Sequence, residues 1–265
     1  MTSISISIRR LCTCSISRGK LTTRVTEPAD PRIVSAWGNN ADLYEAVFDA
    51  HKLRYVRQAR SFVALDHPPP YYSDLTFLAG TDVAGALAEV RKLVEREPRV
   101  ATVKDATCRL DLARFGFRVL FEAYWVCAEA EQISPAGGGW QRIETSMELA
   151  RWEEAWNSAG SPADRRVFVP DILKNPKTTV FGRLEENGFS AGCIANLSPD
   201  SVGVSNLFGE PVRAVVADAA ALAKAFGGGL PVVGYSSGDE LAAMLQAGFM
   251  EIGPLRVWIR ERTTP

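Results

Sequence analysis

The chain has 265 residues, of which 46% are hydrophobic and 23% are charged, the composition of an ordinary globular protein. Its 30 Lys and Arg against 31 Asp and Glu exclude the strongly basic balance of a nucleic-acid binder, and no run approaches the roughly 18 apolar residues of a membrane span. Two histidines and five scattered cysteines, none in a C-x-x-C pair, predict no metal site and a reduced cytoplasmic setting.

Residues 1–26 differ from the rest of the chain, because they contain five basic residues, no acidic one and many Ser and Thr. Such a composition is typical of organelle import signals. The Ser-Ile alternation over residues 3–8, however, suits a strand better than an amphipathic helix. Two interpretations therefore stay open for this segment: a disordered tail or over-extended start before a cytoplasmic protein, and an import signal.

The first half shows helical periodicity up to His51 and again over Val83–Glu97. A short helix then begins at Leu110 and is stopped by Gly116, and an apolar strand follows over Val119–Val126. Residues 135–139, Pro-Ala-Gly-Gly-Gly, have the composition of a linker.

The second half is predicted to have the order β-α-α-β-β-β-α-β-α-β. A capping box at Thr145 and Glu148 opens its first helix, and turns at 187–188 and 198–200 make three of the strands an antiparallel meander. The predicted elements are the strand Trp140–Thr145, the helix Met147–Asn157, a short segment Pro170–Leu173, the strands Thr178–Glu185, Gly192–Leu197 and Val202–Leu207, the helix Val212–Phe226, the strand Pro231–Tyr235, the helix Asp239–Gln246 and the strand Arg256–Arg260.

An internal repeat links the two halves. Leu110–Phe117 matches Leu241–Phe249, each a short helix, a Gly-Phe pair and a strand, and the two glycines are 132 residues apart. The same offset places the helix Val83–Glu97 on the helix that begins near residue 212. We therefore predict a domain over residues 27–134 and a related one over 140–265.

This order, with Gly-Phe before the last strand, resembles the GNAT (general-control-type N-acetyltransferase) superfamily, also called the acyl-CoA N-acyltransferase fold. The resemblance covers the second half and, less fully, residues 33–127. It implies an α+β (mixed α/β) protein with two tandem GNAT-like domains, each a mixed, mostly antiparallel sheet flanked by helices. It also implies acetyl-CoA or another acyl-CoA as cosubstrate and a small-molecule or peptide amine as acceptor, with no nucleic-acid or membrane partner; oligomeric state is not indicated.

The family's cofactor loop, Gln/Arg-x-x-Gly-x-Gly/Ala, falls on residues 206–211 by position and is degenerate here. Gly209 is kept, but Asn206 replaces Gln or Arg, Pro211 lacks an amide donor, and Glu210 brings a negative charge toward a phosphate. Arg213 is the nearby cation. In the first half the loop over residues 74–82 has two acids and no base, which disfavours cofactor binding there. By position, the resemblance assigns cofactor contacts to Ser205, Asn206, Leu207, Phe208, Gly209 and Arg213.

The residues expected to carry catalysis also depart from the family. Its enzymes commonly use a tyrosine four residues before the Gly of Gly-Phe to protonate the leaving thiolate, and Met244 stands there. Tyr235, at the end of the preceding strand, is the phenol expected to replace it. The general base that takes the amine proton is expected among carboxylates near the central strand, with Glu210 and Asp200 as our predicted candidates beside Glu185 and Glu186.

Two functions of different class remain. The preferred one is an acyl-CoA-dependent N-acyltransferase, most simply an N-acetyltransferase, with its cofactor site in the C-terminal half. The alternative is a catalytically inactive GNAT-fold binding module that uses the interdomain cleft for another ligand or partner. Strands that separate near Asn206 and Tyr235 would favour the enzyme, whereas a closed sheet there would favour the binding module.

Overall fold

The computed structural model describes residues 30–78, 82–96, 100–106 and 108–261, so the predicted tail over residues 1–26 lies outside it. The helices are α1 (Pro31–His51), α2 (Val83–Arg96), α3 (Ser146–Ser158), α4 (Val212–Phe226) and α5 (Gly238–Gln246), with 3-10 helices η1 (Ala113–Phe115), η2 (Ala130–Gln132) and η3 (Pro170–Lys174). The strands are β1 (Tyr55–Gln58), β2 (Ser61–Ala64), β3 (Leu75–Phe77), β4 (Ala101–Asp105), β5 (Arg118–Ala128), β6 (Trp140–Arg142), β7 (Thr178–Glu185), β8 (Gly188–Leu197), β9 (Val202–Gly209), β10 (Val232–Ser236) and β11 (Met250–Arg260).

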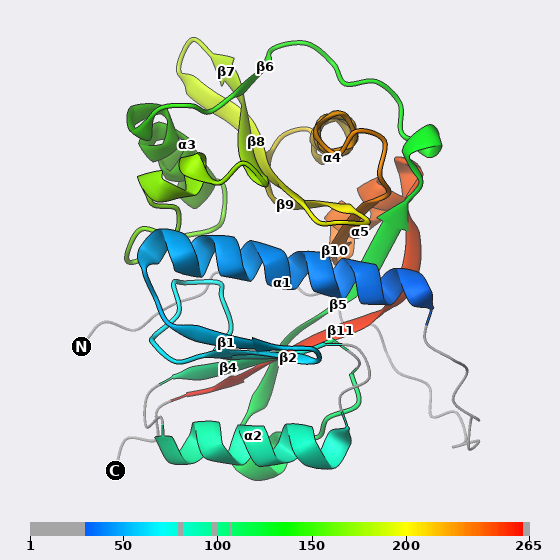
Figure 1. Cartoon of the computed structure of the whole chain (residues 1–265). Helices are drawn as coiled ribbons and strands as arrows, with labels where there is room; N and C mark the ends of the chain where they lie inside the picture. Colours follow the sequence, from blue (N-terminus) through cyan, green and yellow to red (C-terminus); the bar gives the residue numbers. More distant parts are fainter. Residues whose placement is uncertain (1–29, 79–81, 97–99, 107, 262–265) are drawn as a thin grey trace.

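The strands form one continuous sheet in the order β1-β2-β3-β4-β11-β5-β10-β9-β8-β7-β6. The last strand of each half is inserted beside strands of the other half, since β5 pairs with β10 and β11 pairs with β4. β5 and β11 also pair antiparallel with each other along most of their length and join the lower and upper parts of the molecule (Figure 1). The two sheets expected from the sequence are therefore merged into one among the described residues, and the domain boundaries 27–134 and 140–265 stay a prediction.

The order of elements in the two halves is nevertheless the same. Three strands, a helix, a strand, a helical turn or short helix and a final strand make up both β1-β2-β3-α2-β4-η1-β5 and β7-β8-β9-α4-β10-α5-β11. In each, the first three strands are antiparallel and the next one is parallel to the third. The helix expected from Leu110 is only the single turn η1, which ends at Gly116 with a φ of 79°.

Several boundaries differ from the predicted ones for local reasons. β8 begins at Gly188, four residues before the predicted start at Gly192. A Cβ at Gly192 would lie 2.2 Å from the indole nitrogen of Trp152, so this glycine makes room for the core and does not mark the start of the strand. β11 begins at Met250, with an irregular register around Ile252 that carries it through a Gly-Pro pair. β6 ends at Arg142, because Thr145 leaves the strand to cap α3.

Helices cover both faces of the sheet. α1 crosses the middle of one face, and α3 packs on the same face over β8 (Figure 1). Asp30 caps α1, because its side chain accepts a hydrogen bond from the amide of Arg32 at 2.9 Å, and Pro31 suits the first turn. α4 and α5 cover the opposite face, as the alternation along β5 shows: Trp125 packs with α1 and Val126 with α4. α2 covers the same face as α4, because Val103 of β4 packs with α2 while its neighbour Lys104 faces α1.

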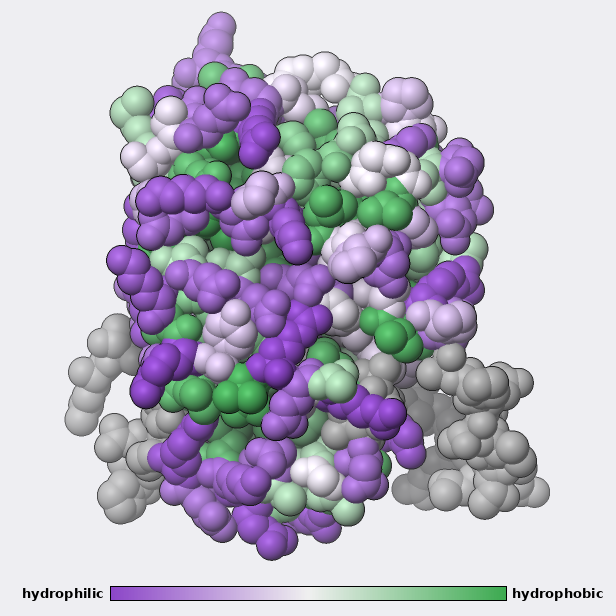
Figure 2. Space-filling model, viewed as in Figure 1, coloured by the Kyte–Doolittle hydropathy of each residue, from purple (hydrophilic) through white to green (hydrophobic). Residues whose placement is uncertain are grey.

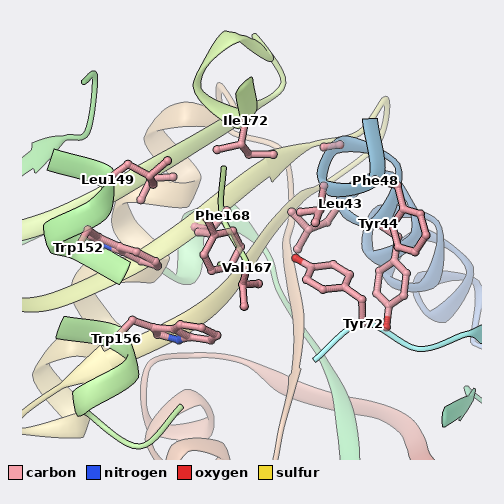
Figure 3. Packing of buried hydrophobic residues seen from close by; sticks show 14 of the residues in the cluster. Leu43, Tyr44, Phe48, Tyr72, Leu149, Trp152, Trp156, Val167, Phe168 and Ile172 are labelled. Carbon is pink, nitrogen blue, oxygen red and sulfur yellow. The ribbon is translucent and has the colours of Figure 1, made fainter. Parts of the chain in front are cut away.

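The largest core cluster lies between α1 and α3 (Figure 3). Trp152 and Trp156 of α3 are stacked with ring centroids 6.4 Å apart, and Phe168 meets both rings edge-on. Tyr44 and Phe48 of α1 close the other side of the cluster. On the surface seen in Figure 2, hydrophilic residues dominate along α1 and hydrophobic residues show only in separate groups. Among the described residues, none of the helices has the length and apolar character of a membrane span.

Candidate functional site

The parallel ladder between β9 and β10 opens toward its carboxyl end. Only two residue pairs join the strands, Val202 with Val232 and Gly203 with Val233, although β9 continues to Gly209. The corresponding strands of the first half, β3 and β4, stay paired along all three residues of β3. In the second half the paired part of the ladder therefore ends while both strands continue, whereas every described residue of β3 is paired with β4; the unpaired stretch of β9 and β10 is called the opening.

A β-bulge marks the same level of β9 on its other side. The register with β8 shifts so that Asn206 and Leu207 together face Cys193. Asn206 has a φ of 54°, a left-handed conformation that asparagine tolerates better than most residues, and its amide donates to the hydroxyl of Ser205 at 3.0 Å. Ser205, Asn206 and Leu207, for which cofactor contacts are predicted, are half-buried beside the opening. The bulge bends β9 where the ladder ends.

Beyond the bulge the chain turns sharply into α4. Phe208 is buried against Trp152, with ring centroids 5.3 Å apart, so its side chain belongs to the core and only its backbone is available to a ligand. Gly209 has a φ of 120°, and a Cβ there would lie 2.6 Å from both Ala191 Cβ and the carbonyl oxygen of Ser190. The structure thus requires glycine at the one position of the cofactor loop that the sequence keeps.

Glu210 folds back onto the start of α4. Its Oε2 accepts a hydrogen bond from the Val212 amide at 3.2 Å, and its carbonyl oxygen accepts one from the Arg183 guanidinium at 3.2 Å. The carboxylate thereby takes a helix N-terminal amide that would otherwise be free for an anion. Arg213 is exposed on the first turn, whereas Arg183, which the sequence analysis did not single out, is a second cation at this end of β9.

Tyr235 points from β10 toward the face that α1 covers. Its ring packs against Trp125 with centroids 5.4 Å apart, and its hydroxyl lies 3.4 Å from Nζ of Lys104 on β4. Lys104 is buried, donates to Asn40 Oδ1 at 2.9 Å and lies over the Tyr44 ring at 4.8 Å. The predicted acid is thus held beside the ammonium group of Lys104.

Lys104 is an unusual member of this cluster. None of the ion pairs within the described residues includes it, so its charge is surrounded by phenols and an amide. Burial acts to raise the pKa of Tyr44, but the neighbouring ammonium and the Ser73 amide outweigh burial and leave this pKa below its ordinary value. This cluster could not be predicted from the sequence, because a lysine in an alternating strand is normally on the solvent face.

Asp200 is not brought together with the other predicted residues. It lies exposed in the turn before β9, within 3.4 Å of the Ser201 hydroxyl. Six residues of extended strand, about 20 Å, separate it from Asn206. Glu185 and Glu186 are also exposed, at the turn between β7 and β8. Of the predicted catalytic residues, Tyr235 borders the opening, Glu210 contacts the first turn of α4, and Asp200 lies at the end of β9 opposite to the opening.

Comparison with known proteins agrees with this architecture. No family model matches the sequence, and no curated protein matches it. Among solved structures, a protein of Novosphingobium aromaticivorans assigned to the GNAT family of acetyltransferases superposes with a TM-score of 0.57 and 11% identity, covering 88% of this chain and 97% of its own. A GCN5-related N-acetyltransferase of Kribbella flavida is similar with a TM-score of 0.55 and 17% identity, covering 86% of this chain and 94% of its own. Another from Sphaerobacter thermophilus is similar with a TM-score of 0.52 and 13% identity, covering 88% of this chain and 91% of its own. The chain has the acyl-CoA N-acyltransferase fold.

In this acyltransferase fold the α5 segment contains a carboxylate that the sequence analysis missed. Met244 is buried in the core that α5 shares with α4. One turn earlier, Glu240 Oε1 accepts a hydrogen bond from Ser236 Oγ at 2.8 Å. Burial raises the pKa of Glu240, and the Ser236 hydroxyl opposes this only in part. Glu240 lies four residues before Met244, and this i, i+4 spacing on one helix face is the sequence signal that could have identified it.

Proposed function

We propose that the protein is an acyl-CoA-dependent N-acyltransferase, with acetyl transfer to a small-molecule or peptide amine as its simplest activity. The observation that carries this proposal is the ladder between β9 and β10, whose pairing ends after Gly203 and Val233 although both strands continue. The fold similarity supports an acyl-CoA cosubstrate, and the opening supports a site in the C-terminal half.

The opening provides space between two strands and unpaired backbone amides, the two features that binding of a thioester requires. The pantetheine arm would lie between β9 and β10, and backbone amides released from pairing near Leu207 would polarise the thioester carbonyl. The amine would approach from one side of the same opening, so that most of the rate comes from holding two reactants together. Ser205, Asn206 and Gly209 would shape this site through the bulge and turn.

Calorimetric titration tests the proposal directly. Acetyl-CoA and longer acyl-CoAs are titrated into the full-length protein, with free CoA as a competitor. We expect binding with a Kd below about 1 mM, equivalent to about 4 kcal/mol or more of binding free energy. Absence of binding for every acyl chain would refute the proposal.

Glu210 should weaken acyl-CoA binding in the natural protein. Glu210→Ala frees the Val212 amide and removes a negative charge from the helix N-terminus, so we expect the Kd for acetyl-CoA to fall about 3- to 10-fold. Calorimetry measures the change, with Glu186→Ala as a control that removes the same charge from an exposed turn. An unchanged or weaker affinity in Glu210→Ala alone would contradict this role.

The same carboxylate favours a second candidate function. Glu210 occupies the amide at the start of α4 that a phosphate would need, and Met244, which has no proton to give, stands where the family's acid is expected. If both features exclude the reaction, the protein is a non-catalytic binding module of this fold. In that case the natural protein binds no acyl-CoA, and any binding appears only after Glu210→Ala frees the Val212 amide. Titration of the natural protein beside this variant therefore separates the candidates without knowledge of the acceptor.

A further inference from the structure

Glu240 lies at the corner where β10 passes into α5, next to the end of the open ladder. Ser236, the last residue of β10, is buried, and its hydroxyl donates a hydrogen bond to Glu240 Oε1. The other carboxyl oxygen, Oε2, makes no hydrogen bond within the described residues, and Glu240 is partly exposed. One oxygen is thus fixed by the strand end while the other is available to a ligand.

The position of Glu240 differs from that of Tyr235 in a way that matters chemically. Tyr235 is directed to the face covered by α1, where Lys104 and Trp125 hold it. Side chains of successive strand residues point to opposite faces, so Ser236 and its partner Glu240 lie on the face of α4, whose N-terminus is the predicted phosphate site. Glu240 therefore lies on the same face of the sheet as the predicted phosphate site, whereas Tyr235 lies on the opposite face.

Expulsion of a thiolate at neutral pH is helped by a proton donor, because an ordinary thiol has a pKa near 8.5. A carboxyl group can donate only while it is protonated, and burial favours the neutral form of Glu240. Met244, one turn further along the same helix face, has a thioether and no proton to give. Within the α5 segment, Glu240 is therefore the group with the required chemistry.

We infer that Glu240, positioned by Ser236, is the general acid that protonates the leaving thiolate of the acyl-CoA. The inference rests on the proposed function. The amine nitrogen attacks the thioester carbonyl, a C–N bond forms and the C–S bond breaks, and the sulfur takes the carboxyl proton of Glu240. The proton lost by the nitrogen passes to water, and water returns one to Glu240, so the products are the amide and the free thiol.

The test compares Glu240→Gln with Asp239→Asn, which removes the same charge from the exposed neighbouring position. Release of free thiol from acetyl-CoA is followed with n-butylamine and with water alone as acceptor. For Glu240→Gln we expect a loss of about 100-fold in kcat with the Kd for acetyl-CoA unchanged within about twofold. Asp239→Asn should keep wild-type values.

A second donor separates acid catalysis from a structural role. An acetyl thioester of an aromatic thiol leaves without help, so the loss in Glu240→Gln should shrink to about threefold with that donor. An equal loss with both donors, or no loss with acetyl-CoA, overturns the assignment of Glu240 while leaving the proposed function intact. Wild-type protein that binds no acyl-CoA, or binds it without turnover, overturns the inference, and the failure to bind overturns the proposed function as well.

Stability gives a readout that needs no activity. Because the folded-state pKa of Glu240 is raised, its contribution to stability is complete below the ordinary glutamate value and is lost as pH rises through the folded-state value. Glu240→Gln cannot ionise, so urea unfolding should show it gaining stability relative to wild type as pH rises above about 5. A difference that does not change with pH would contradict a neutral Glu240.

Discussion

Replacement of Glu153 by alanine should lower the free energy of unfolding by about 3–5 kcal/mol. Glu153 is buried on α3, where Oε1 accepts the amides of Val167 and Phe168 at 2.5 and 3.0 Å and Oε2 accepts the Arg166 guanidinium at 2.9 Å. Without the carboxylate, two buried amides lose their partners, and the segment that carries Phe168 into the core of Figure 3 is released from α3.

Urea unfolding monitored by tryptophan fluorescence measures this loss, and Glu154 provides the control. Glu154→Ala removes the same side chain from the exposed side of α3, where a change within about 0.5 kcal/mol is expected. If the two variants are equally stable, the hydrogen bonds of Glu153 do not hold the loop as described.

Gly209→Ala should both destabilise the protein and weaken acetyl-CoA binding. The φ of 120° disfavours alanine, which costs about 1–2 kcal/mol, and the added Cβ would be forced against Ala191, which adds about 1–3 kcal/mol. Relief of this overlap must move the turn between β9 and α4, and with it the amides expected to meet the pyrophosphate. We expect the Kd to rise more than about 10-fold, since misplaced amides lose their charge-assisted hydrogen bonds.

Gly188 allows the two effects to be separated. It has a φ of 121°, almost the same as Gly209, but a Cβ there meets open space. Gly188→Ala should therefore show the φ cost alone in urea unfolding and bind acetyl-CoA as wild type does in calorimetry. Equal affinities for the Gly188 and Gly209 variants would argue against a role of the β9–α4 turn in binding.

The sequence predicted the order of elements because order depends on local signals. The capping box at Thr145 and Glu148 is confirmed, and the helix it opens differs from the predicted one by one residue at each end. The exchange of β5 and β11 was not predicted, because alternation along a strand specifies its buried face and not its neighbour. The resemblance in fold is confirmed, whereas the predicted tandem arrangement stays a prediction.

The candidate site was less accessible from sequence than the fold. The loop was located through Gly209, but its closure by Glu210 depends on a turn geometry that no motif specifies. Lys104 and Glu240 differ from most other charged residues by their burial. Their burial could not be predicted from the sequence, because it arises only when β4, β10 and α5 pack together. Asp200 shows that nearness in sequence is not enough: this carboxylate directly precedes β9 in the chain but lies at the end of the strand far from Asn206.

The strand exchange has a consequence for how the chain folds. β11 is synthesised after every other strand of the sheet, yet it lies between β4 and β5, which are made more than 100 residues earlier. During translation the first half therefore has an incomplete sheet whose open edges are β4 and β5, and such edges can pair with other chains. Completion of the sheet is thus expected to be slow, because it is dominated by contacts of high sequence separation.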